Sequence, residues 1–156
     1  MLKNKENLLI YFENSIDRVK RLTAITEEQW RTPIAEGKWS IAEIVGHLIP
    51  WDRYITEQRL PFLLRDKDLP NSPDVNQLNQ QAATLSRMKT KGEIIEEFIA
   101  NRRKLIIAIN NIPVEIWEKE FMIGSSTLTL YNYLLGIIEH DEHHFEQIQS
   151  ALKVSS

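Results

Sequence analysis

Apolar residues near the start of the chain recur at the spacing of an amphipathic helix. They are Leu8, Leu9, Phe12, Ile16, Val19 and Leu22. Because residues three and four positions apart share one face of an α-helix, this pattern predicts a first helix of about 20 residues. Residues 26–33 read as a connection with a short helical turn, since Pro33 and Gly37 both interrupt regular structure.

A second helix is predicted to begin after Ser40. The Ser40 hydroxyl can accept a hydrogen bond from the Glu43 N–H while the Glu43 carboxylate reaches back, which is the capping box that opens many helices. The apolar period continues through Ile41, Ile44, Leu48, Ile55, Leu60 and Phe62. Pro50 falls inside this segment and removes the hydrogen bond to the Gly46 carbonyl, so we expect a bend just after His47, or a break.

The middle of the chain begins with a loop. Residues 66–73 are interpreted as that loop because they end in Pro-Asn-Ser-Pro. Asp74 can then cap a polar helical segment, which we expect to be mostly exposed because it is rich in Asn and Gln. Its thin apolar stripe consists of Val75, Leu78, Ala82 and Leu85.

Two more long helices are predicted in the second half. Thr90 and Glu93 form another capping box, and the helix that they open ends before Pro113. Its apolar stripe consists of Ile94, Ile95, Phe98, Leu105, Ile106 and Ile109. Residues 113–126 read as an irregular connection with some apolar anchoring, and residues 129–152 as the last helix. The inward positions of that helix are Leu130, Leu134, Ile137, Ile138, Phe145, Ile148 and Leu152.

These elements define the expected fold class. No segment shows the pattern of a strand of any length, so the sequence predicts an all-α protein. Four long helices with longer connections in the middle predict a four-helix bundle with extra short helical segments in the connections. With 156 residues, the chain is expected to form a single domain over residues 1–156.

Composition and charge exclude several classes of function. The net charge of −3 provides no basic surface for nucleic acid or an anionic membrane, so neither partner is expected. The chain has no cysteine, which excludes disulfides, a thiolate metal site and a cysteine nucleophile. We read neither a signal peptide nor an apolar run of the roughly 18 residues that a membrane span requires. A cytoplasmic protein is therefore expected.

The chemical interest of the sequence lies in three of its four histidines. His140 and His144 are one helical turn apart, so both imidazoles can face one cation. At about 100° per residue, the pair lies on one shoulder of the apolar stripe of its helix, and His47 lies on a shoulder of its own stripe. If the two helices are neighbours, the three rings meet at an edge of the core. The fourth histidine, His143, points about 60° to the other side of His140.

Three imidazoles are a suitable ligand set for a divalent metal ion. Zinc, nickel, iron and copper all accept imidazole, and three protein ligands leave a coordination position for water or substrate. Glu43 and Asp141 are candidates to hydrogen-bond and orient the ligands, as is Glu139. The alternative is that the pair at positions i and i+4 is simply two surface histidines. The Glu that follows the first His in zinc metalloprotease helices is absent, because Asp141 stands there.

Two segments carry a resemblance to a known family. Residues 38–48 read Lys-Trp-Ser-Ile-Ala-Glu-Ile-Val-Gly-His-Leu, and residues 140–148 read His-Asp-Glu-His-His-Phe-Glu-Gln-Ile. They resemble two motifs of the DinB-like superfamily. In its second-helix motif, Trp-Ser precedes a helix that carries a Glu and then His-Leu. Its last-helix motif is His-Asp-x-His-His followed by Gln-Ile. Residues 74–79 and 90–93 are similar to its middle section, so the resemblance spans nearly the whole chain.

The resemblance implies an antiparallel four-helix bundle, often a homodimer, with a divalent metal held by three histidines. By position these would be His47, His140 and His144. Zinc, nickel and iron are not distinguished. The superfamily includes thiol-dependent S-transferases and isomerases that use low-molecular-weight thiols such as bacillithiol or mycothiol. This implies a small-molecule substrate and makes a metal-dependent thiol S-transferase the first hypothesis.

Other functions stay open at this stage. A hydrolase that uses metal-bound water is a near variant of the first hypothesis. A second class is a non-catalytic, dimeric, stress-related bundle whose metal is structural or absent, and a third is a plain bundle whose histidines bind nothing. The fourth coordination position separates them, because a further ligand such as His143 or Glu139 would close the shell of a structural site.

Overall fold

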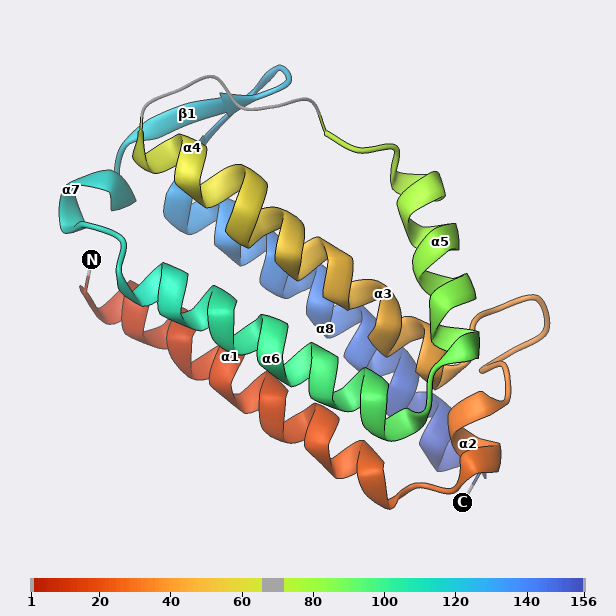
Figure 1. The fold of residues 1–156 in the computed structure, drawn as a ribbon. Helices are drawn as coiled ribbons and strands as arrows, with labels where there is room; N and C mark the ends of the chain where they lie inside the picture. The colour runs from red at the N-terminus through yellow and green to blue at the C-terminus, as the bar shows by residue number, and fades with distance from the viewer. Residues whose placement is uncertain (1, 66–71, 156) are drawn as a thin grey trace.

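A computed structural model describes residues 2–65 and 72–155 and confirms the predicted all-α bundle. Its four long helices are α1 (Leu2–Arg21), α3 (Ile41–Tyr54), α6 (Lys91–Asn110) and α8 (Leu130–Ser155). Figure 1 shows that α1 and α8 run in one direction and α3 and α6 in the other. Among the described residues, no helix has both the length and the apolar character to cross a membrane.

The apolar stripes predicted from the sequence form the core. In the first predicted stripe, the residues Leu8, Phe12, Ile16, Val19 and Leu22 are all buried. The buried apolar residues fall into two clusters along the bundle, one around Ile44, Phe98 and Phe145 and the other around Ile55, Leu105 and Leu134. Helices α1, α6 and α8 each contribute to both clusters, and the residues between the clusters lie at the middle of the bundle.

The helix that carries His47 begins as predicted but continues further than expected at Pro50. Ser40 caps α3, and the reciprocal hydrogen bonds with Glu43 are both present. The helix runs through Pro50 to Tyr54 without a break. The departure from α-helical geometry comes later, in a π-helical segment (Ile55–Arg59) that leads into the short helix α4 (Leu60–Leu64).

The polar segment after the predicted loop is the helix α5 (Val75–Met88), capped by Asp74. Residues 66–71 of that loop lie outside the described residues. Helix α5 packs closely on α3 at Gly46, where a Cβ atom would come within 1.8 Å of Ser86 Oγ. Glycine at this position therefore permits the close approach of the two helices.

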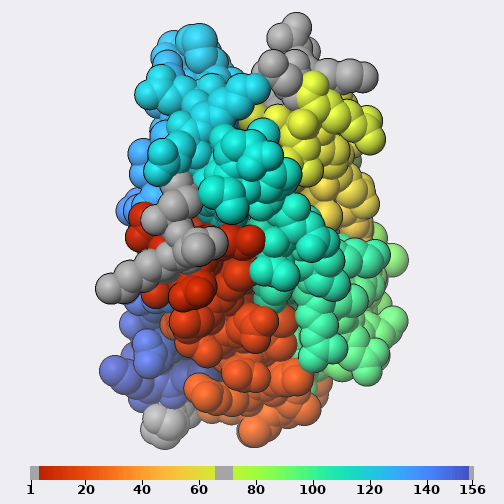
Figure 2. All heavy atoms as spheres, turned by 90° about the vertical axis from the view of Figure 1, so that its left-hand side faces the viewer, coloured from red at the N-terminus to blue at the C-terminus, as the bar shows by residue number. Residues whose placement is uncertain are grey.

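The connection before the last helix contains strands, so the prediction that the chain has none was wrong. After the short helix α7 (Val114–Trp117), strands β1 (Glu120–Ile123) and β2 (Ser126–Thr129) form an antiparallel hairpin in which Glu120 pairs with Thr129. Gly124 makes the turn at a φ of 59°, a conformation that favours glycine. The Phe121 ring packs against Tyr133 of α8. Figure 2 shows this end of the molecule, with the hairpin beside α4.

The remaining short elements lie in the connection that was expected to hold a helical turn. A 3-10 turn (Leu22–Ala24) follows α1, and α2 (Glu27–Arg31) begins at a capping box of Thr26 and Gln29. Helix α2 lies near the carboxyl end of α8 (Figure 1). The extra helical segment predicted between the first two long helices is therefore confirmed.

Candidate metal centre

The structure brings together the three histidines that were chosen from their positions around the predicted helices. His47 comes from α3, and His140 and His144 come from α8. One ring nitrogen from each lies within 4.8 Å of the other two. The ring centroids are 4.5 Å apart for His47 and His144, and 4.6 Å apart for His140 and His144. Residues almost 100 positions apart in sequence thus share one small volume.

The three rings differ in their exposure to solvent. His47 is 1% exposed, His144 is half-buried and His140 is exposed. The indole ring of Trp39 covers one side of the His47 ring, with the two centroids 4.8 Å apart. The group is therefore closed towards the core and open on the side of His140.

Hydrogen bonds fix the orientation of two of the rings. His47 Nδ1 donates to the carbonyl oxygen of Ile44, one turn earlier in α3. His144 Nδ1 donates to Gln147 Oε1 at 2.9 Å. Because Nδ1 carries the hydrogen in both rings, Nε2 keeps its lone pair and is the atom able to bind a metal. Gln147 was not predicted as an orienting residue, although its i+3 spacing from His144 places it on the same face of α8.

The surroundings favour neutral imidazoles. Burial, followed by the proximity of His144, lowers the pKa of His47 to about 4. Burial also lowers the pKa of His144. Metal ligands must be deprotonated at the coordinating nitrogen, so rings that resist protonation fit a metal site.

The two carboxylates proposed to orient the histidines have other hydrogen-bond partners. Glu43 accepts from the N–H and hydroxyl of Ser40 and from Arg87 Nε at 3.0 Å, and so joins the start of α3 to α5. Although burial raises the pKa of Glu43, these bonds leave it below its ordinary value. Asp141 accepts from Arg102 and Tyr11. Among the hydrogen bonds of the described residues, neither carboxylate accepts from a histidine.

Sequence reasoning missed a buried ionic network beside the histidines. Arg102 donates to both oxygens of Asp52, at 2.8 and 2.9 Å, and to Asp141 Oδ2 at 2.5 Å. A further bond of 3.1 Å reaches Ser15. All four residues are at most 2% exposed, and they come from the four long helices. The available signal was that Arg102 occupies the apolar stripe of α6, four residues after Phe98.

The remaining acidic and histidine candidates lie outside the group. His143 is exposed, and its ring centroid lies 5.3 Å from that of His144. Glu139 is exposed as well. Within residues 2–65 and 72–155, no fourth His, Asp or Glu joins the three histidines. Among the described residues, the group therefore offers three side-chain ligand atoms and not four.

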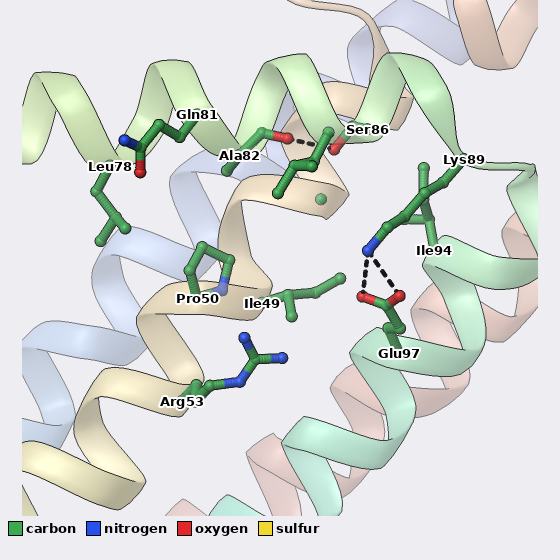
Figure 3. A pocket seen from close by; sticks show the side chains of 12 residues that line it. Ile49, Pro50, Arg53, Leu78, Gln81, Ala82, Ser86, Lys89, Ile94 and Glu97 are labelled. Atoms are coloured by element: carbon green, nitrogen blue, oxygen red, sulfur yellow. Dashed lines mark hydrogen bonds and ion pairs between the residues drawn. The ribbon is translucent and has the colours of Figure 1, made fainter.

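A cavity adjoins the open side of the group. It has a volume of about 340 Å³, and His140 and Trp51 are among the residues that line it. A different cavity of about 280 Å³ lies between α3, α5 and α6, where Lys89 forms an ion pair with Glu97 (Figure 3). No histidine lines that second cavity. Of these two cavities, only the first is lined by one of the three histidines.

Comparison with known proteins identifies the family. The model of the DinB superfamily matches residues 12–148. The chain belongs to the DinB superfamily. A comparison with curated proteins found no match.

Two solved structures share the DinB fold of this chain. One is YfiT from Bacillus subtilis, described as a probable metal-dependent hydrolase with an unusual four-helix bundle topology. It superposes with a TM-score of 0.82 at 16% identity, over 97% of this chain and 87% of YfiT. The other is the mycothiol-dependent maleylpyruvate isomerase, with a TM-score of 0.67 at 12% identity. That match covers 95% of this chain but 59% of the isomerase.

Proposed function

We propose that His47, His140 and His144 bind a divalent metal ion and that the protein is a metal-dependent enzyme acting on a small molecule. The observation that carries the proposal is the convergence of three ring nitrogens within 4.8 Å, closed on one side and open on the other. Three imidazole nitrogens this close together could hold one divalent ion after small movements of the rings.

The chemistry follows from the open coordination position. His47, His140 and His144 would hold the ion as neutral imidazoles, and a bound ion would lower the pKa of a water or thiol and polarise a substrate carbonyl. The protein contributes orientation through the Ile44 carbonyl and Gln147, which hold the rings of His47 and His144. Trp39 covers one side of the site, so a substrate approaches from the side of His140.

Two reaction classes are candidates, and each has a structural neighbour in its favour. Hydrolysis by an activated water is supported by the similarity to YfiT, described as a probable metal-dependent hydrolase. Transfer of a low-molecular-weight thiol to an electrophile is supported by the similarity to a mycothiol-dependent isomerase. We place hydrolysis first because the YfiT match covers most of both chains.

The test combines metal analysis with two assays. Protein purified without a histidine tag is loaded with zinc, nickel, manganese or iron(II) and assayed for hydrolysis of p-nitrophenyl esters. A second assay measures conjugation of 1-chloro-2,4-dinitrobenzene with glutathione, cysteine or bacillithiol. We expect one metal ion per chain and turnover in one of the assays. His140→Ala should lose both the metal and the turnover, and His143→Ala should keep both.

Two results would contradict the proposal. Failure of the wild-type protein to bind any of these metals would leave a bundle whose histidines have no ligand. Loss of metal in His140→Ala with unchanged turnover would separate the metal from the reaction, as expected for a non-catalytic metal. The homodimer implied by the family resemblance stays a prediction, which light scattering can measure in the same samples.

A further inference from the structure

The cavity beside His140 extends along α8 away from the three histidines. Tyr133, Gly136, Ile137 and His140 line it from α8 at the spacing of one helical face. At 1.5 Å per residue, Tyr133 and His140 are about 10 Å apart along the helix axis. A Cβ atom at Gly136 would have nothing within 4 Å, so this stretch of the cavity is open space.

Arg59 lines the same cavity from the end of the π-helical segment. The residue is 5% exposed, and Nη2 donates to Ser72 Oγ at 2.7 Å. Within the described parts of the chain, Nε has no hydrogen-bond partner and no carboxylate forms an ion pair with Arg59. π-Helical turns occur frequently at functional sites, where they displace a side chain from its regular position.

The other buried arginine shows what Arg59 lacks. Arg102 is matched by two carboxylates, whereas the partners of the Arg59 guanidinium among the described residues are a hydroxyl and the face of the Tyr54 ring, 5.2 Å away. A buried charge without a counter-charge is costly, because burial removes its hydration. Tyr54 lines the same cavity, and its hydroxyl is also buried without a partner among the described residues. These two groups are therefore complementary to an anionic ligand.

We propose that Arg59 and Tyr54 bind the carboxylate of a small substrate whose reacting group reaches the three histidines. The planar guanidinium donates two parallel hydrogen bonds to a carboxylate, and the Tyr54 hydroxyl supplies another. The apolar wall formed by Leu48, Ile55 and Ile137 fits a short hydrocarbon body between the two ends. The ligand class is thus a carboxylic acid with a short hydrocarbon body between its acid group and its reacting group.

This inference rests on the proposed function, because it assigns the reacting end of the ligand to the metal centre. The carboxylate can belong to either of two reactants: the molecule that is hydrolysed or attacked, or the thiol. Both sources present the same chemistry to Arg59. The experiment therefore uses one pair of probes for each source.

The first pair of probes is 3-phenylpropionate and its uncharged amide, and the second is 6-mercaptohexanoate and 6-mercaptohexanol. Binding is measured by calorimetry and ligand-observed NMR on the full chain, both metal-free and loaded with zinc. We expect the wild-type protein to bind an acid at least tenfold more tightly than its neutral analogue. A preference confined to the thiol pair in the zinc form assigns the carboxylate to the thiol, and a preference in the phenyl pair assigns it to the other reactant.

Variants then assign the preference to the residue. Arg59→Gln should abolish the preference for the acid, and Arg59→Lys should keep part of it as a point charge. Arg53→Gln is the matched control, since Arg53 lies on α3 but lines the other cavity (Figure 3), and it should behave as wild type. Circular dichroism checks folding, and if Arg59→Gln does not fold, the comparison between Arg59→Lys and wild type decides.

The outcomes separate this inference from the metal proposal. If wild type binds acid and neutral analogue equally, or if the preference survives in Arg59→Gln, the assignment of Arg59 is wrong, whatever the metal content. If the metal-free protein prefers 3-phenylpropionate through Arg59 but no metal binds, the carboxylate site stands and the metal proposal fails. Zinc content is therefore measured in every variant.

Discussion

Two polar clusters lie side by side in this bundle and are built in opposite ways. The ionic network of Ser15, Asp52, Arg102 and Asp141 is fully buried, and each charged group in it is paired. The three histidines differ in exposure, from the buried His47 to the exposed His140. Their facing nitrogens converge without a proton donor between them. The first cluster has the properties of a structural element, and the second those of a ligand site.

The two clusters differ in whether their polar groups satisfy one another. The network lies between the two apolar clusters, and its residues come from all four long helices, so it ties the helices together at one level. Such groups serve structure because every buried donor meets an acceptor. The three histidines, by contrast, direct nitrogen lone pairs towards one point at the edge of the core, and this arrangement is incomplete without a cation. Satisfaction of hydrogen bonds, rather than burial alone, separates the two roles.

The largest effect is expected from breaking the ionic network. Arg102→Met leaves Asp52 and Asp141 buried without their cation, which should lower the free energy of unfolding by about 3–5 kcal/mol. Urea unfolding followed by circular dichroism measures this loss. Arg103→Met, at an exposed neighbouring position, should change stability by less than about 0.5 kcal/mol. Equal stability of both variants would show that the network contributes nothing.

A second effect concerns the pH dependence of the same cluster. Burial raises the pKa of Asp52 from its ordinary value of 3.8 to about 6, against the opposing effect of Arg102. The native state therefore holds the Asp52 proton more tightly than the unfolded state does. The contribution of Asp52 to stability is present at low pH and is lost as the pH rises from about 4 to about 6, by up to roughly 3 kcal/mol.

Asp52→Asn isolates this contribution, because asparagine does not titrate. The substitution should cost most stability near pH 4 and least near pH 7, which urea unfolding at both pH values measures. Asp74→Asn is a control at an exposed helix cap, since Asn also caps helices. A cost of Asp52→Asn that stays constant with pH would mean that Asp52 remains ionised throughout.

The stability of the protein should depend on whether a metal ion is bound at the three histidines. With zinc at about 100 times its dissociation constant, the free energy of unfolding should rise by about 2.7 kcal/mol, and EDTA should reverse the rise. His140→Ala should abolish the response because the ion loses a ligand, and His143→Ala should keep it. A response that persists in His140→Ala would place the ion elsewhere.

A smaller effect is expected from the residue that orients His144. Gln147→Ala removes the acceptor of the His144 Nδ1 hydrogen and should weaken zinc binding about tenfold, as losses of orienting partners commonly do. Competition with a chromophoric chelator measures the affinity. Gln149→Ala, exposed on the same helix, is the matched control and should leave the affinity unchanged.

The sequence allowed the bundle and the three histidines to be predicted, because both depend on helical periodicity. Apolar spacing located the long helices, and the capping boxes at Ser40 and Thr90 located two of their first residues. The same phase calculation put the histidines of two helices on compatible faces. Local periodicity carries information about any site whose ligands lie on regular helices.

The network and the hairpin could not be found in this way. A charged residue in an apolar stripe, such as Arg102, looks the same in sequence whether it is paired inside the core or reaches out to solvent. The strands of the hairpin have four residues each, too few for a period of two to be recognised. Both features depend on contacts between segments that are distant in sequence or on a turn at Gly124.

The smallest predicted effect concerns Glu43. Like the residues of the ionic network, its carboxylate has hydrogen-bond partners within the protein, although it lies one turn from His47. Its carboxylate accepts from the backbone N–H and hydroxyl of Ser40, so Glu43→Ala should cost about 1 kcal/mol of unfolding free energy. Zinc affinity should stay within about twofold of wild type, because the His47 ring is held by the Ile44 carbonyl instead. Glu43→Gln keeps an acceptor for the capping box and should restore most of the stability. A loss of zinc affinity in both variants, measured by chelator competition, would make Glu43 an orienting residue and would remove the distinction between the two clusters at this position.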